Sequence, residues 1–169
     1  LLFFVREKNN KFIFEIMNIR KNKIISKHLF DNKKKFGEAK LGLVASYAWQ
    51  TDPKRMAITL SRYKFVSKML EGKKNVLEVG CGDSFQNRIV KQVVSNLTAI
   101  DINEYLINDA RKNNSKTYKV NHYVHNILEK PFYTQDKNFD AVYSLDVLEH
   151  IEKKSENLFM ENILSSMNE

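Results

Sequence analysis

Residues 75–84 read Asn-Val-Leu-Glu-Val-Gly-Cys-Gly-Asp-Ser, a short apolar run that ends in two glycines two positions apart. The run from Asn75 to Val79 is typical of a buried β-strand. Glycines at positions 80 and 82 allow the backbone to turn sharply and to approach a ligand at a distance that a Cβ would prevent. The segment therefore predicts a strand followed by a ligand-binding turn.

Strand and helix patterns alternate along the chain on the C-terminal side of this segment. A long amphipathic helix is expected before it, starting at Asp52-Pro53, where an N-cap residue precedes a proline, and ending at Gly72. Alternating strands and helices form parallel sheets with right-handed crossovers, so the predicted class is α/β with a doubly wound sheet and helices on both faces. The further strands are expected at 97–101, 118–124 and 139–145, and the further helices at 86–94, 104–112 and 156–167.

The net charge of +8 is concentrated at the start of the chain. Residues 1–35 contain ten Lys/Arg and three acidic residues, whereas residues 36–169 contain 18 and 17. A basic arm can bind phosphates, but such runs are more often solvated or disordered. We therefore divide the chain into a basic arm (1–35), a helical segment (36–72) and a ligand-binding domain (73–169). A non-catalytic nucleic-acid-binding protein that uses the arm is one alternative.

Three further sequence features concern the start of the chain, membrane spans and cysteine chemistry. It begins with Leu1, and Met17 opens a plausible start, so the residues before Met17 are candidates for non-native sequence. The longest nearly apolar stretch runs from Leu41 to Trp49, far short of the roughly 20 residues that span a bilayer. Cys81 is the only cysteine, which excludes an intrachain disulfide and a thiolate zinc cage. We expect a cytoplasmic protein without a membrane span or a metal site.

A carboxylate closes the second expected strand. Asp101 lies 21 residues after Gly80, near the spacing of about 20 at which an acidic residue meets a ribose diol. Phe85 occupies the position where the dinucleotide fingerprint needs a glycine, and Glu78 and Asp83 place negative charge where a pyrophosphate would lie. S-adenosylmethionine has no phosphate and carries an ammonium and a sulfonium, so it suits this turn. A fragment of an NAD(P)-dependent oxidoreductase or epimerase is the other alternative.

Three segments resemble motifs of the class I S-adenosylmethionine-dependent methyltransferases. They are residues 76–82 (Val-Leu-Glu-Val-Gly-Cys-Gly), 99–101 (Ala-Ile-Asp) and 139–151 (Phe-Asp-Ala-Val-Tyr-Ser-Leu-Asp-Val-Leu-Glu-His-Ile), which look like the family's first, second and fourth motifs. The resemblance covers roughly residues 73–165 and implies a Rossmann-like, mostly parallel sheet. It also implies methyl transfer from the sulfonium to an oxygen, nitrogen or carbon of a small-molecule acceptor, rather than to nucleic acid.

The resemblance also implies a cofactor site. The glycine turn would border the methionine and ribose portions of the cofactor, and Asp101 would accept the ribose hydroxyls. Asn126 replaces an acidic residue of the family and can still accept the adenine amine through its carbonyl oxygen. Ser84 replaces a third small residue, commonly glycine. The cofactor-binding residues that the resemblance implies are Glu78, Gly80, Cys81, Gly82, Asp101, Ile102, Asn126, Ile127, Ser144 and Leu145.

Methyl transfer from a sulfonium needs alignment more than acid or base catalysis, because the methyl group is already activated. His150 is the first candidate for a general base, since it follows the fourth expected strand at the rim of the crevice and an imidazole titrates near neutrality. Glu149 is the second candidate. The alternative is that residues 148–151 simply begin a helix in which His150 caps or packs.

The class I fold normally continues with three more strands after the fourth. Here 24 residues follow Leu145, enough for one helix, so we expect a sheet that is incomplete at the C-terminus. The strand at 139–145 would then be an exposed edge, and we expect the chain to be weakly stable or to self-associate through this edge. We interpret residues 73–169 as the N-terminal, cofactor-binding part of a methyltransferase domain.

Overall fold

The computed structural model describes residues 19–134 and 139–167, with side chains from residue 26 onward. The expectation about the residues before Met17 lies outside the described residues. The chain divides into two compact units, Leu1–Glu38 and Ala39–Glu169, which are described separately.

The described part of the first unit is one helix, α1 (Ile19–Phe36). This stretch contains neither glycine nor proline, and the helix ends at Gly37, whose φ of +74° is typical of a helix stop. Three lysines, residues 33–35, occupy the last turn, where they interact favourably with the helix dipole. The described part of the basic arm is therefore a helix, which ends at Phe36.

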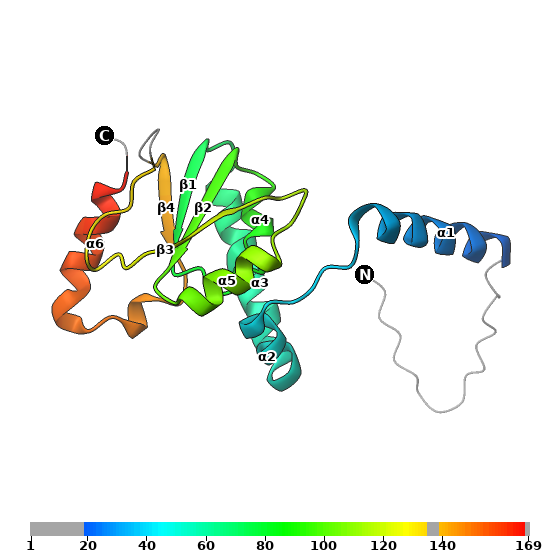
Figure 1. The fold of residues 1–169 in the computed structure, drawn as a ribbon, viewed down its shortest axis with the longest axis horizontal. Coiled ribbons are helices and arrows are strands. Elements are labelled where there is room, and N and C mark those ends of the chain that lie inside the picture. Colours follow the sequence, from blue (N-terminus) through cyan, green and yellow to red (C-terminus); the bar gives the residue numbers. More distant parts are fainter. Residues whose placement is uncertain (1–18, 135–138, 168–169) are drawn as a thin grey trace, which may run out of the picture. The chain divides into compact units, whose positions relative to one another are not determined.

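A four-stranded parallel sheet forms the centre of the second unit (Figure 1). Its order is β3-β2-β1-β4, which confirms the predicted parallel α/β sheet. The strands are β1 (Asn75–Val79), β2 (Asn96–Asp101), β3 (Asn121–Val124) and β4 (Ala141–Ser144).

Two strands are shorter than the sequence predicts. Before β3, the backbone of Val120 bonds to the side chain of Asn114 instead of a neighbouring strand. Before β4, Phe139 forms an isolated parallel bridge with Met167, and its N–H donates to the carbonyl of Ser166. The expectation that only a helix follows Leu145 was therefore incomplete, because the described chain returns to the start of β4.

Helices cover both faces of the sheet. The predicted N-cap of α3 is confirmed, since the Asp52 carboxylate accepts the N–H of Arg55 at 3.2 Å. α4 is shorter than predicted, because Lys91 Nζ bonds the carbonyls of Val94 and Ser95 and the chain turns there into β2. The helices are α2 (Leu43–Thr51), α3 (Pro53–Met69), α4 (Arg88–Lys91), α5 (Glu104–Lys112) and α6 (Glu156–Ser165), with two short 3₁₀ turns, Leu148–His150 and Lys153–Ser155.

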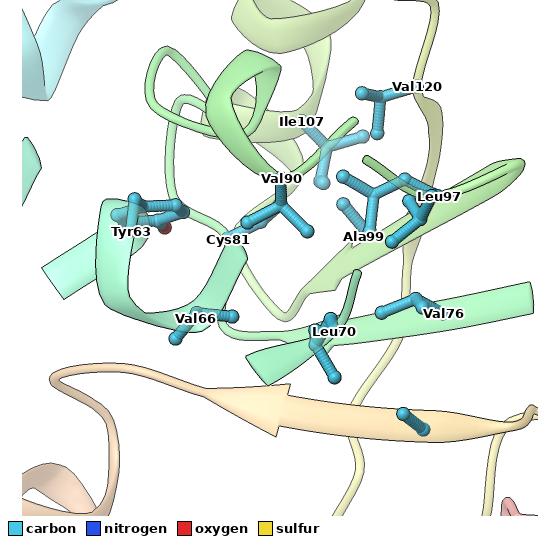
Figure 2. Packing of buried hydrophobic residues seen from close by; sticks show 12 residues of the cluster. Tyr63, Val66, Leu70, Val76, Cys81, Val90, Leu97, Ala99, Ile107 and Val120 are labelled. Carbon is cyan, nitrogen blue, oxygen red and sulfur yellow. The ribbon is translucent and has the colours of Figure 1, made fainter. Parts of the chain in front are cut away.

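Two apolar clusters sandwich the sheet, and β1 contributes alternate residues to each. Val76 belongs to the cluster under α3, α4 and α5, where Tyr63, Val66 and Val90 pack against the strands (Figure 2). Leu77 belongs to the cluster on the opposite face, which α6 covers. Because successive side chains of a strand alternate, this pattern directs the next residue, Glu78, into the first cluster.

No described helix combines the length and hydropathy that a membrane crossing needs. Within the same part of the chain, no group of three or more His, Cys, Asp or Glu side chains is placed to hold a metal ion.

Candidate functional site

A cavity of about 580 Å³ opens at the carboxyl ends of the strands. The segments that follow all four strands contribute to its wall, as expected for a parallel sheet of this kind. α2 and α3 close it from the other side through Val44, Ala45 and Ala48 and through Arg55, Met56, Thr59 and Tyr63. A volume of this size suits a small-molecule ligand.

Most of the residues expected to bind a cofactor line this cavity. Glu78 and Ser144 do not line it, and neither does Glu149. His150 does line it. The expected cofactor residues found in the wall are Gly80, Cys81, Gly82, Asp101, Ile102, Asn126, Ile127 and Leu145.

The turn after β1 requires its glycines. Gly80 and Gly82 have φ values of +80° and +55°, which side chains rarely adopt. A Cβ on Gly80 would also overlap the side chain of Val147, whereas a Cβ on Gly82 would meet nothing within 4 Å. At Gly80, the backbone therefore lies close to the segment after β4 and not to a ligand. At Gly82, the space beside the backbone is open, so a ligand can approach it there.

The Asp101 carboxylate forms hydrogen bonds with the backbone that follows β1 and with the backbone that follows β2. Its Oδ2 accepts the N–H of Gly82 at 2.8 Å, and its Oδ1 accepts the N–H of Asn103 at 2.8 Å. Each carboxylate oxygen retains a further lone pair that a ligand hydroxyl can use. Beside it, Ile102 is 67% exposed and presents an apolar surface to the cavity.

Glu78 is buried beneath the glycine turn. The Tyr63 hydroxyl donates to its Oε1, whereas its Oε2 has no hydrogen-bond partner among the described residues. Burial raises the pKa of Glu78 to about 7, and the Tyr63 hydrogen bond opposes the increase. Tyr63 lines the cavity and Glu78 does not, so the hydrogen bond from the Tyr63 hydroxyl places Glu78 directly behind the cavity wall.

Cys81 belongs to the apolar cluster under α3 as well as to the cavity wall. Burial and the neighbouring Glu78 raise the pKa of its thiol. The thiol therefore stays protonated, and Cys81 is a packing residue rather than a nucleophile.

Asp83 has a role that the sequence analysis missed. It was expected to present its charge to the ligand, but its buried Oδ2 accepts the N–H of Ala45, in the first turn of α2, at 2.7 Å. Asp109 of α5 accepts the N–H of Leu43 at 3.0 Å, so two carboxylates hold the N-terminus of α2. A Cβ on the preceding Gly42 would overlap Asp83. A helix start without a side-chain cap of its own was the available sequence signal.

The turn also contains a strained residue. Ser84 has a φ of +58°, and its hydroxyl forms a 2.8 Å hydrogen bond with His122 Nε2 from β3. Burial, with a smaller contribution from Arg111, lowers the pKa of His122 to about 4, so the imidazole is neutral at physiological pH. This contact ties the turn to the outer strand of the sheet.

The segment after β3 is fixed by its own side chains. Asn126 Oδ1 accepts the N–H of Leu128 at 3.0 Å, and its Nδ2 donates to Glu129 at 3.1 Å. His125 bonds the carbonyl of Lys130 at 2.9 Å. Asn126 Oδ1 keeps one lone pair free for a ligand amine.

The segment after β4 carries the candidate base. The Ser144 hydroxyl donates to the carbonyl of Val79 at 2.9 Å and so joins β4 to β1 outside the cavity wall. Asp146 has a φ of +56° and forms an ion pair with Arg62 of α3. His150 ends a single 3₁₀ turn, is exposed, and its imidazole has no hydrogen-bond partner among the described residues. The described residues show no capping hydrogen bond from it.

Comparison with known proteins identifies a family. A family model described as "Methyltransferase domain" matches residues 77–164, about half of the chain. No curated protein matches the sequence.

Several solved structures share the fold. The N-methyltransferase NodS from Bradyrhizobium japonicum WM9, in complex with S-adenosyl-L-homocysteine (SAH), has a TM-score of 0.57 and 19% identity over 67% of this chain and 57% of NodS. The DhpI–SAH complex has a TM-score of 0.58 and 20% identity over 73% of this chain and 58% of DhpI. Magnesium protoporphyrin IX methyltransferase (ChlM) from Synechocystis PCC 6803, with bound SAM, has a TM-score of 0.52 and 15% identity over 91% of this chain and 75% of ChlM. The chain thus spans less than two thirds of the length of NodS and of DhpI.

Proposed function

Because the chain belongs to the methyltransferase domain family, we propose that it is an S-adenosylmethionine-dependent methyltransferase that acts on a small-molecule acceptor. The proposed cofactor site is the cavity at the carboxyl ends of the strands. NodS and DhpI contain SAH and ChlM contains SAM, which supports this choice of cofactor.

The contact between Asp101 and Gly82 carries the proposal. The 2.8 Å hydrogen bond fixes the carboxylate at the cavity wall, where its remaining lone pairs can accept two ribose hydroxyls. The open backbone at Gly82 leaves room for the nucleoside beside it. These residues fit a nucleoside cofactor, and Ile102 and Asn126 are the proposed adenine contacts.

The charge of the cavity favours a cationic cofactor over a dinucleotide. Among the described residues, the carboxylates of Asp83, Asp101 and Asp146 line it, against Arg55 in the wall and Arg62, which pairs with Asp146, so one negative charge is in excess. Like charges would repel the pyrophosphate of NAD(P), whereas a sulfonium and an ammonium are attracted. This balance is the argument against the oxidoreductase alternative.

When bound, the cofactor supplies an activated methyl group on its sulfonium. The chain's contribution is to orient the two reactants, through Asp101 on one side and the segment after β4 on the other. His150, at the rim with an unpaired imidazole, is the proposed proton acceptor for an acceptor hydroxyl or amine. Glu149, in the cavity that adjoins the rim, is the second candidate.

The test is a calorimetric titration of the chain with SAH and, separately, with NADH. We expect saturable SAH binding and no NADH binding. Asp101→Ala should weaken SAH binding by about 10- to 100-fold, because hydrogen bonds to a charged group contribute about 1.5–3 kcal/mol. Asp31→Ala, on the exposed surface of α1, removes the same charge and should bind SAH like the wild type.

Other results of these titrations would contradict the proposed function. Saturable binding of NADH, or none of SAH, contradicts the proposal. Steeply salt-dependent RNA or DNA binding that persists in Asp101→Ala would favour the nucleic-acid alternative through the basic arm. Circular dichroism melting of each variant separates lost binding from lost folding.

The proposal also includes self-association of the chain and its location in the cell. Self-association through the edge of β4 is supported by the sheet order, which places β4 at an edge. A cytoplasmic location is supported by the single, buried and reduced Cys81.

A further inference from the structure

A second cavity, also of about 580 Å³, adjoins the proposed cofactor cavity. The two share four lining residues, Arg55, Thr59, Asp146 and His150. Because the candidate base His150 belongs to both, the second cavity is where an acceptor would meet the cofactor. We propose that this acceptor cavity takes a hydrophilic small molecule with an oxyanion group, a carboxylate or a phosphate, and that Arg55 binds that group. The inference rests on the proposed function.

The lining of the acceptor cavity decides the polarity of its ligand. Ile58 is the only apolar residue among the described residues that line it. An extended apolar acceptor would remove water from these polar groups without replacing their hydrogen bonds, which costs free energy. A small polar molecule can replace that water. The lining residues are Asp52, Lys54, Arg55, Ile58, Thr59, Arg62, Asp146, Glu149 and His150.

The described residues that line this cavity include three carboxylates and three cations, and two of the cations have no ion-pair partner. The Asp52 carboxylate accepts the Arg55 N–H at the start of α3, and Asp146 is paired with Arg62. The ammonium of Lys54 and the guanidinium of Arg55 have no partner among the described residues. The carboxylates of Asp52 and Glu149 balance these two charges in number, so what a ligand anion would find here is a guanidinium that no described side chain pairs with.

Arg55 is the better placed of the two free cations. It lines both cavities, whereas Lys54 lines only the acceptor cavity. Arg55 lies four residues before Thr59 and seven before Arg62, so the three share one face of α3. A guanidinium binds carboxylate or phosphate through two parallel hydrogen bonds, which orients the ligand as well as attracting it. An anion on Arg55 would leave the rest of the acceptor to reach His150.

The test uses inorganic phosphate and acetate as probes, titrated into the SAH-saturated, isotope-labelled chain and followed by NMR. Saturable shifts are expected for residues 52–62 and 146–150 with at least one of the two anions. If both anions bind, the cavity accepts carboxylates and phosphates alike. If only one binds, the acceptor carries that group, a phosphate or a carboxylate.

Matched variants assign the site. Arg55→Gln should weaken the anion that binds by about tenfold or more, the effect of losing a charge-assisted pair. Lys64→Gln removes a charge from the exposed face of the same helix, outside both cavities, and should bind the anion like the wild type. SAH affinity, measured by calorimetry, should stay within about twofold of the wild type in Lys64→Gln.

Three results would overturn the inference while leaving the proposed function intact. One is SAH binding without any anion-dependent shift at the acceptor cavity. Another is equal weakening by Arg55→Gln and Lys64→Gln, which would indicate a general charge effect. The third is loss of SAH affinity in Arg55→Gln with unchanged anion binding, which would assign Arg55 to the cofactor's own carboxylate. Absence of SAH binding to the wild type would instead contradict the proposed function.

Discussion

Glu78 and His122 are buried titratable side chains whose pKa values shift in opposite directions. Burial raises the pKa of Glu78 to about 7 and lowers that of His122 to about 4, so each favours its neutral form. The free energy of unfolding therefore falls through Glu78 as the pH rises from about 4.5 to about 7. It falls through His122 as the pH drops from about 6.5 to about 4. The two effects oppose each other in the overlap.

Glu78→Gln should remove one of these effects. The amide keeps a carbonyl that accepts the Tyr63 hydroxyl, but it does not ionise. Between pH 5 and pH 8 the wild type should lose about 2 kcal/mol of unfolding free energy that the variant retains. Urea unfolding of both proteins at the two pH values measures the difference. Identical pH dependence would show that Glu78 already ionises freely in the folded chain.

Helix α2 is held over the cavity by groups from other elements. It has no side-chain cap of its own, and its first turn is bonded by Asp83 from the glycine turn and Asp109 from α5. Because Val44, Ala45 and Ala48 line the cavity, the position of α2 and the shape of the ligand site depend on each other.

Asp83→Ala should therefore weaken SAH binding by about tenfold. The substitution leaves the buried N–H of Ala45 without an acceptor, at a cost of about 1–3 kcal/mol, and frees α2 from the turn. Asp109→Ala is the matched control, since it removes an exposed bond to the same helix and should have a smaller effect. Calorimetry with SAH measures both variants. Unchanged affinity in Asp83→Ala, with the fold intact, would contradict a role for α2 in the site.

The two edges of the sheet differ in protection. At the β3 edge, the Arg111 guanidinium bonds the carbonyl of His122 at 2.8 and 3.2 Å. At the β4 edge, the bridge between Phe139 and Met167 covers only the start, and Ala141–Ser144 pair with β1 alone among the described strands. Unpaired strand backbone favours pairing with another chain.

We therefore expect reversible, concentration-dependent association through β4. Sedimentation velocity over a range of chain concentrations should show growth beyond the monomer. Hydrogen exchange should slow at residues 141–144 with increasing concentration, whereas residues 121–124 serve as the internal control. A monomer at all concentrations, or equal changes at both edges, would contradict association through this edge.

Local sequence signals were sufficient for the order of the strands and the helices between them and for the place of the ligand cavity, whereas β3, β4 and α4 were predicted too long and α1 was not predicted. Apolar periodicity, the Asp52-Pro53 start and the glycine turn predict β1, α3 and the parallel sheet, because these signals act within a few residues. A parallel sheet brings its carboxyl ends to one edge whatever its loops contain, which predicts that Asp101 lies in the ligand cavity, and the family resemblance predicts the same for Ile127.

Packing of the folded chain established the contacts that give the cavity its chemistry. Arg62 and Asp146 are 84 residues apart in sequence, and Asp83 and Ala45 are 38 apart. Neither pair leaves a periodic signal, since each joins elements that are far apart in the sequence. Their identity depends on side-chain geometry between distant elements, which composition and spacing do not encode.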